Sequence, residues 1–242
     1  MKKSAFLVIG LLFFSHEALA QASWSAIGFS ALPQNTPALV AAADELMASP
    51  VGKTFPGQLY LQTNVADGSG PATHTWVPVY ESAGQREAWI AKLQASPAWS
   101  AFLWKIQQLS EPVGTTLYRT IGSWGDVNDS DSVWLTHAFA VSDPPAFRAA
   151  VGKLLASPTG KKFPGQVHLS VVVAGGLTPV TGVISVGYAS EAEMEAWVAT
   201  RNASADWTAY LESSGKVSEY LGTNLARTVK RWGAATLRQL TD

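Results

Sequence analysis

Histidine is the side chain in this sequence that is best suited to acid–base chemistry near neutral pH, and it is also a common metal ligand. Beyond the N-terminal segment the chain has three, His74, His137 and His168. We expect each to lie in or beside a strand, and we interpret all three as candidate catalytic bases. The alternative for each is a structural role. No two are close in sequence, and no His, Asp or Glu spacing typical of a metal site occurs, so we predict no metal.

A polar stripe accompanies these histidines. In the segment 58–65, Tyr60, Gln62 and Asn64 share one face of an expected strand, because successive side chains of a strand alternate between its faces. We interpret Tyr60 and Asn64 as substrate-binding residues that would hold a developing oxyanion while a histidine removes a proton. Trp76 could cover such a pocket. A solvent-facing stripe at a sheet edge is the alternative.

Two arginines are candidates for binding an anion. Arg119 and Arg227 each alternate with apolar residues in an expected strand, which is unusual for a charged side chain. A partly buried arginine needs a carboxylate or carbonyl partner, and that partner could belong to a ligand. Structural bracing of the strand is the alternative. The two arginines also occupy matching places in the chain, which raises the question of a repeat.

The sequence contains two copies of one unit. GKTFPGQLYL begins at Gly52 and GKKFPGQVHL begins at Gly160, an offset of 108 residues. The same offset pairs Trp89 with Trp197 and Arg119 with Arg227, without a gap from Pro37 to Gly125. Upstream of that range the offset becomes 110 and pairs Trp24 with Trp134. Self-similarity of this length indicates internal duplication.

Each copy predicts the order β-α-β-β-α-β. In the first copy the expected strands and helices are 23–32, 38–47, 58–65, 74–81, a helix that starts after Ser82 and breaks or restarts at Pro97, and 115–124. This order is the ferredoxin-like split βαβ arrangement, which leaves one sheet face bare. We therefore predict an α+β protein in which two tandem ferredoxin-like units pack sheet to sheet within one chain. The repeated FPGQ would be the return from helix to strand.

The chain divides into four predicted segments. Residues 1–20 read as a signal peptide, with Lys2 and Lys3 before an apolar run and a cleavage pattern of small residues ending at Ala20. The first repeat covers 21–125, a polar linker 126–133, and the second repeat 134–242. We therefore expect a periplasmic or secreted protein, with an uncleaved N-terminal anchor as the alternative.

Composition narrows the partners. The formal net charge is −1 and Lys and Arg form no cluster, so we expect neither nucleic acid nor, after signal cleavage, a membrane surface as partner. The chain has no cysteine, so an exported form must be stabilised by packing alone. Ten tryptophans can supply much of that packing. Association of this chain with further copies of itself is left open by the composition.

These motifs resemble a known superfamily. Tyr80-x-Ser82, then Glu87-Ala88-Trp89, then Ala95-Ser96-Pro97-Ala98-Trp99 are similar to the dimeric α+β barrel proteins, and more narrowly to antibiotic-biosynthesis-monooxygenase-type domains. The resemblance covers both copies and implies a single-chain dimeric α+β barrel with ligand pockets between sheet and helices. In haem-degrading members a histidine after the helix tryptophan ligates iron. Leu103 and Leu211 stand near that position here and cannot ligate iron.

The resemblance implies a function class. We expect a cofactor-independent monooxygenase-like enzyme acting on a small aromatic or polyketide-like compound, with the substrate itself as electron source and no cofactor. One alternative is a non-catalytic binding protein for a hydrophobic small molecule or haem. Another is a structural or interaction domain whose pockets are closed by tryptophan.

Overall fold

The computed structural model describes residues 21–68, 70–125, 130–176 and 179–233, so the predicted signal peptide lies outside the described residues. We call residues 21–125 the first half and residues 130–233 the second half. The first half contains β1 (Ser23–Ala31), α1 (Thr36–Ala48), β2 (Gln58–Ala66), β3 (His74–Tyr80), α2 (Ala83–Gln94), α3 (Pro97–Leu109) and β4 (Ser110–Trp124). The second half contains β5 (Val133–Val141), α4 (Pro144–Ala156), β6 (Val167–Gly175), β7 (Gly182–Tyr188), α5 (Glu191–Asn202), α6 (Ala205–Ser214) and β8 (Ser218–Gly233).

The predicted second helix is two helices in each half. Pro97 ends one helix and begins the next, because proline fits the first turn of a helix, where no backbone donor is needed. Ser96 caps α3 by accepting a 3.2 Å hydrogen bond from the backbone nitrogen of Ala98. The start of α2 is capped by side chains from both sides of its first turn. Ser82 Oγ accepts from Gln85 N at 3.1 Å, and Gln85 Oε1 accepts from Glu81 N at 2.9 Å.

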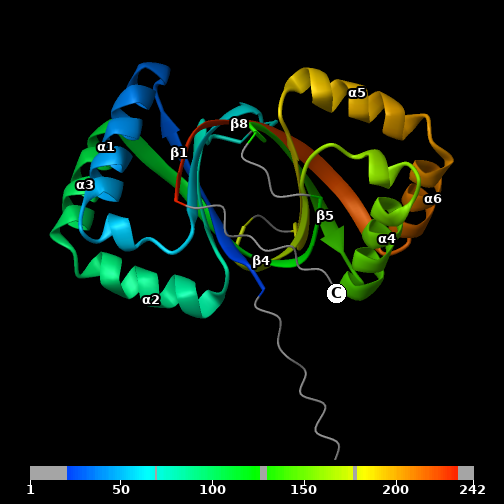
Figure 1. Cartoon of the computed structure of the whole chain (residues 1–242), viewed down its shortest axis with the longest axis horizontal. Coiled ribbons are helices and arrows are strands. Elements are labelled where there is room, and N and C mark those ends of the chain that lie inside the picture. Colours follow the sequence, from blue (N-terminus) through cyan, green and yellow to red (C-terminus); the bar gives the residue numbers. More distant parts are fainter. Residues whose placement is uncertain (1–20, 69, 126–129, 177–178, 234–242) are drawn as a thin grey trace, which may run out of the picture.

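The eight strands of the described ranges form one closed antiparallel barrel in the order β1-β3-β2-β8-β5-β7-β6-β4. The predicted α+β fold with two ferredoxin-like halves is confirmed. The sheets of the two halves are hydrogen-bonded to each other at both of their edges, through the pairs β2–β8 and β4–β6. Closure removes the unpaired edges that two separate sheets would expose. Figure 1 shows the helices of the two halves on opposite sides of the central barrel.

The repeated FPGQ stretch is the return from helix to strand, as predicted. A short 3₁₀ helix, Gly52–Thr54, precedes it, and β2 begins at Gln58. A side chain on Gly57 would place its Cβ 2.1 Å from the carbonyl oxygen of Val79, and one on Gly165 would lie equally close to that of Gly187. Glycine is needed at both positions because the backbone of the neighbouring strand passes too close for a side chain.

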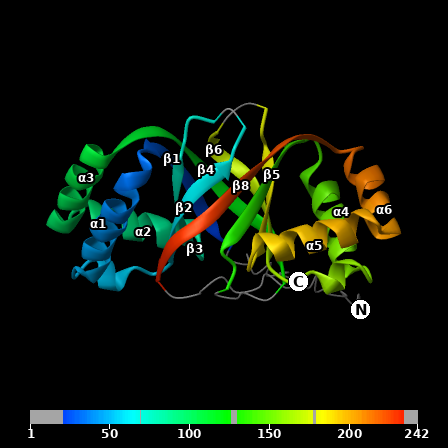
Figure 2. The same ribbon diagram turned by 90° about the horizontal axis from the view of Figure 1, so that it is seen from above.

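The last strand of each half ends in the other half. β4 carries Trp124 into the helix–sheet core of the second half, and β8 carries Trp232 into the core of the first half. Figure 2 shows β8 crossing from the helices of its own half to the opposite end of the molecule. The two cores are therefore completed only when both halves are present, which makes one cooperative body of the duplicated chain.

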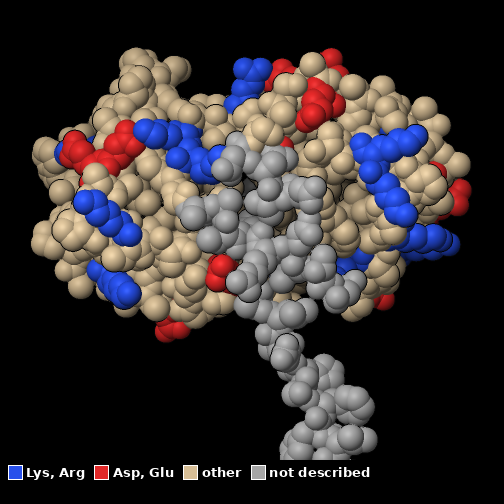
Figure 3. Space-filling model, viewed as in Figure 1, with Lys and Arg blue, Asp and Glu red and all other residues tan. Residues whose placement is uncertain are grey.

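Charged side chains of both signs are interspersed on the face shown in Figure 3, over the helices at both ends of the molecule. Within the described ranges, no helix is both long enough and apolar enough to cross a membrane.

Candidate functional site

Three cavities are relevant to function. One lies between sheet and helices in the second half and has a volume of about 360 Å³; we call it the second-half cavity. Its counterpart in the first half has a volume of about 400 Å³ and is called the first-half cavity. A smaller one of about 80 Å³, the barrel cavity, lies among side chains that point into the barrel. The two larger ones are in the size range of small-molecule sites.

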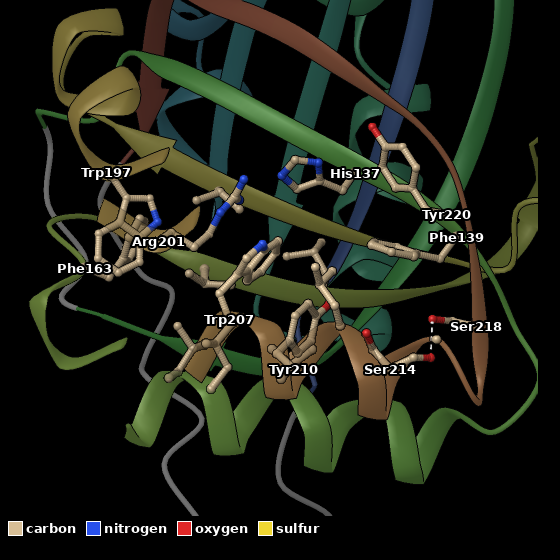
Figure 4. Close-up of a pocket in the computed structure, with 18 of the residues that line it drawn as sticks. His137, Phe139, Phe163, Trp197, Arg201, Trp207, Tyr210, Ser214, Ser218 and Tyr220 are labelled. Carbon is tan, nitrogen blue, oxygen red and sulfur yellow. Dashed lines mark hydrogen bonds between the residues drawn. The ribbon is translucent and has the colours of Figure 1, made fainter. Parts of the chain in front are cut away.

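Aromatic and aliphatic side chains make most of the wall of the second-half cavity. Trp197 comes from α5, Trp207 and Tyr210 come from α6, and Phe139 lies on the floor formed by β5. Figure 4 shows Trp207 and Tyr210 facing the sheet, with Arg201 beside Trp207 and with His137 and Tyr220 on the other side of the cavity. A flat aromatic ligand would pack well against such walls.

Arg201 is the charged group of this cavity. Its guanidinium carbon lies 4.1 Å from the centre of the Trp207 ring, a cation–π contact. Burial lowers the pKa of Arg201, and nearby Tyr188, Tyr210 and Tyr220 act in the opposite direction. No carboxylate among the described residues pairs with it. Since arginine stays protonated in proteins, the cavity holds a positive charge that a ligand anion could neutralise.

His137 lies beside Arg201 and is tied into a short hydrogen-bond chain. Its Nδ1 is 2.6 Å from Thr223 Oγ1, which in turn is 2.6 Å from the Tyr220 hydroxyl. Burial, and then the positive charge of Arg201, lower the pKa of His137 to about 4. The imidazole is therefore neutral at physiological pH and able to accept a proton from a bound ligand.

The first-half cavity lacks this polar set. Leu93 takes the position of Arg201 and Ile27 that of His137. The other replacements are equally apolar: Phe102 for Tyr210, Ile106 for Ser214 and Pro112 for Tyr220. The two copies share walls and tryptophans but differ in their polar groups: Arg86 and Gln94 line the first-half cavity, which lacks counterparts of Arg201 and His137. This asymmetry assigns the candidate site to the second half.

The three predicted histidines lie in three separate places. His137 lines the second-half cavity and His168 lines the barrel cavity, on strands that β7 separates. His74 lies in the first-half core, where its Nε2 is 2.9 Å from Thr36 Oγ1 and its Nδ1 is 2.8 Å from Thr73 Oγ1. Burial lowers the pKa of His74. With both ring nitrogens engaged, His74 has a structural role.

The predicted stripe on β2 points into the barrel and does not reach His137. Tyr60 and Gln62 line the barrel cavity, and the Tyr60 hydroxyl donates a 2.6 Å hydrogen bond to Gln58 Oε1. Asn64 lies further along β2, where its amide donates to the carbonyl oxygen of Ala72 at 2.8 Å. Tyr60 and Asn64 are therefore unable to hold an oxyanion formed beside His137.

The other predicted binding residues also lie elsewhere. Trp76 is buried in the first-half core and lines the first-half cavity. Arg119 and Arg227 are exposed rather than partly buried, because these positions of the long last strands face solvent. Arg227 forms an ion pair with Glu191 at 2.7 Å, which supports the bracing interpretation.

Arg201 was missed by reasoning from the sequence. The signal was present in the repeat. Arg201 of the second copy corresponds to Leu93 of the first, and each lies four residues after a tryptophan that both copies share, Trp197 or Trp89. Arg119 and Arg227 occur in both copies, whereas Arg201 occurs in only one.

No family model and no curated protein matches this sequence. Solved structures do. A candidate monooxygenase from Fusobacterium nucleatum subsp. nucleatum ATCC 25586 superposes with a TM-score of 0.59 at 13% identity, covering 90% of this chain and 97% of that one. The protein has the dimeric α+β barrel fold. An anthrone oxidase-like protein superposes on this barrel with a TM-score of 0.57 at 11% identity, covering 92% and 97% of the two chains. A heme-binding protein from Thermus thermophilus gives a TM-score of 0.51 at 10% identity, covering 87% and 92%.

The residues of this barrel do not fit haem held by a helix histidine. Leu103 and Leu211, which stand near that position, line the first-half and second-half cavities and have no donor atom for iron. Among the described lining residues of these two cavities, His137 is the single histidine, and its Nδ1 is already engaged by Thr223.

Proposed function

We propose that the second-half cavity binds a small planar aromatic compound that carries an acidic or phenolic group, and that the protein oxidises this compound without a cofactor. The observation that carries the proposal is Arg201, a guanidinium stacked on Trp207 in a cavity whose walls are mostly aromatic and aliphatic. Arg201 is half-buried and its Nε donates to the Asn202 side-chain oxygen at 3.3 Å, so among the described residues its charge lacks a carboxylate partner, which a ligand anion could provide. The aromatic walls favour a flat ligand body around that anionic group.

The neighbouring His137 supplies the proton acceptor for such chemistry. It would take a proton from an activated CH or OH group, and Arg201 would stabilise the resulting enolate or phenolate. If the substrate has a CH₂ group between aromatic rings, reaction with O₂ gives a ketone and one water. The substrate then supplies all four electrons, one oxygen atom enters the product and the other leaves as water. The printed names of the similar structures, a candidate monooxygenase and an anthrone oxidase-like protein, support this reaction class.

Binding is tested with a hydroxynaphthoic acid and its methyl ester, followed by quenching of tryptophan fluorescence. We expect Arg201→Leu, which installs the residue of the first half, to weaken binding of the acid by about tenfold or more and to leave the ester nearly unchanged. The matched control is Arg86→Met at the first-half cavity. It also replaces an arginine by the apolar residue at the corresponding position of the other half, here Met194. Equal losses for acid and ester would contradict a charge-specific site.

Oxidation is tested by O₂ consumption with anthrone as the probe. We expect uptake that His137→Ile reduces by about a hundredfold, in the usual range for a positioned general base. The substitution copies Ile27 of the first half, so the fold should tolerate it. Tight binding without any O₂ uptake would favour the alternative, a non-catalytic binding protein for a hydrophobic small molecule.

Export is part of the proposal. Cleavage after Ala20 would release a mature chain beginning at Gln21 in the periplasm or outside the cell. The intact mass of the protein purified from its native compartment tests this directly, since an uncleaved chain keeps the mass of residues 1–20.

A further inference from the structure

The barrel cavity has a polar lining that the proposed function does not use. Side chains from seven strands reach it, and among its described lining residues there is no Asp, Glu, Lys or Arg. The lining consists of Trp24, Tyr60, Gln62, Val77, Val79, Thr120, Trp134, Thr136, His168 and Ser185. A polar cavity of this kind is normally filled, because its groups need hydrogen-bond partners.

On one side of the barrel these partners are present. Trp24 Nε1 donates a 3.0 Å hydrogen bond to Ser170 Oγ, which lies 3.2 Å from Thr120 Oγ1. Ser170 is fully buried, so this chain of three polar groups is satisfied within the protein.

The related side of the barrel is incomplete. The repeat places Trp134 where Trp24 stands, Gln62 where Ser170 stands and Thr228 where Thr120 stands. Trp134 Nε1 and Thr228 Oγ1 are both buried and have no hydrogen-bond partner in the part of the chain that the structure describes. Thr228 lies opposite Gln62 in the pairing of β2 with β8. An external group is therefore needed to supply what Ser170 supplies on the other side.

His168 adds an unsatisfied group beside Trp134 in the lining of the barrel cavity. Its Nδ1 is 2.9 Å from Ser123 Oγ, and its ring stacks on Trp134 with 6.2 Å between ring centres. Its Nε2 is buried and, among the described residues, without a partner. When Ser123 donates its hydroxyl hydrogen to Nδ1, the ring hydrogen is on Nε2, which then donates as Trp134 Nε1 does.

The unpaired groups can all donate, so their common partner must be rich in acceptors. Trp134 Nε1 is a donor only, His168 Nε2 donates when Ser123 donates to Nδ1, and Thr228 has a hydroxyl hydrogen. We propose that the barrel cavity is a binding site for a small carboxylate or similar oxyanion of the size of formate or acetate. A volume of about 80 Å³ corresponds to only about two or three waters, which excludes the aromatic ligand proposed for the second-half cavity.

Binding of an anion here takes up a proton. Burial lowers the pKa of His168 to about 4, so the ring is neutral at pH 7 in the free protein. A bound anion favours the imidazolium form, and the only other titratable side chain of the described lining is Tyr60. Affinity should therefore rise as the pH falls from about 7 to 5, by at most about tenfold per pH unit.

The test uses the full chain and sodium acetate, with formate and nitrate as further probes. Binding is followed by the indole N–H resonance of Trp134 in ¹⁵N-labelled protein and by calorimetry at both pH values. We expect saturable binding in the millimolar range or tighter, a shift of the Trp134 resonance, and an affinity that increases at lower pH. His168→Phe should reduce the affinity by about tenfold and abolish its pH dependence.

Two further variants keep the test decisive. Thr228→Val removes one donor at nearly constant volume and should weaken acetate binding even if His168→Phe fails to fold. Arg201→Leu, in the second-half cavity, should leave acetate binding unchanged while it impairs binding of the aromatic acid. Because the two sites are read by different probes, failure of one proposal leaves the other standing. Absence of saturable binding for all three anions, with ordered water alone in a high-resolution crystal structure, would overturn the inference.

Discussion

Trp232 Nε1 donates a 2.8 Å hydrogen bond to Asp44 Oδ1, joining the end of the last strand to the first helix across 188 positions of the chain. Lys230 Nζ, on the same strand, donates to Asp44 Oδ2 at 2.9 Å. The second half has no such contact, because Gly152 stands where Asp44 does and the Trp124 ring lies beside it. One exchanged tryptophan is thus held by a carboxylate and the other by packing alone.

Removing this carboxylate should loosen the join between the halves. We expect Asp44→Ala to lower the free energy of unfolding by about 1 kcal/mol, a value reduced by the partial exposure of the pair. Hydrogen bonds from Lys230 and then Trp232 hold the pKa of Asp44 below its usual 3.8. The contribution is therefore complete above about pH 4 and is lost as the pH falls through the lower, folded-state pKa. Urea unfolding at several pH values measures both effects.

The control for this variant is Glu45→Ala, one residue further along α1. Glu45 pairs with Lys105 on the helix surface, where ion pairs contribute only a few tenths of a kcal/mol. A loss as large for Glu45→Ala as for Asp44→Ala would show that the strand-to-helix contact has no special role.

The glycine of the FPGQ turn makes a second prediction. Gly57→Ala would bring a methyl group to within 2.1 Å of the Val79 carbonyl oxygen, so one strand must shift. We expect a loss of about 2–3 kcal/mol, similar to overpacking in a core. Gly84→Ala in α2 is the matched control, since nothing lies within 4 Å of the added carbon and alanine favours helix. Thermal unfolding that ranks Gly84→Ala as the more harmful change would contradict this.

Much of the architecture could be predicted because the chain contains the fold twice. The repeat, the Ser82 and Pro97 signals and the alternation along 58–65 depend on local chemistry, which a sequence displays directly. The exchange of Trp124 and Trp232 between halves could not be predicted, since it depends on how the two sheets join at their edges. Nothing local in β4 or β8 reveals which half their ends will contact.

The site was predictable only in part, for a related reason. His137 was a candidate, but a strand pattern does not say whether a residue faces the helices or the barrel interior. That uncertainty grouped His137 with Tyr60 and Asn64, whereas the closed barrel places the stripe of β2 on the opposite side of the sheet. The comparison of copies would have identified Arg201 had it been applied to every charged residue.

The buried histidines should make stability depend on pH. The pKa of His137 and that of His168 are each lowered to about 4, mainly by burial, from 6.5 in the unfolded chain. Between these values the unfolded state binds more protons, so stability is complete above about pH 6.5 and falls as the pH decreases toward 4. The loss is at most about 3 kcal/mol for each histidine.

This dependence is checked by urea unfolding at about pH 7 and about pH 4.5. We expect His168→Phe and His137→Ile each to flatten the decline, whatever they do to stability at neutral pH. The change in unfolding free energy between the two pH values can be compared among proteins even when a variant is less stable at neutral pH. A decline that is identical in both variants and the unmodified chain would mean that other groups, such as His74, carry the titration.

The second-half cavity can also be blocked at its mouth without touching its charge. Leu211 lines this cavity and is 51% exposed, and Leu103 is its counterpart at the first-half cavity. We expect Leu211→Trp to weaken binding of a hydroxynaphthoic acid by about tenfold, because the larger ring occupies space that the ligand needs. Leu103→Trp should have little effect on the same probe, since the first-half cavity lacks counterparts of both Arg201 and His137. If Leu103→Trp were the variant that impaired binding, the ligand would lie in the first half, and the role assigned to Arg201 and His137 would be wrong.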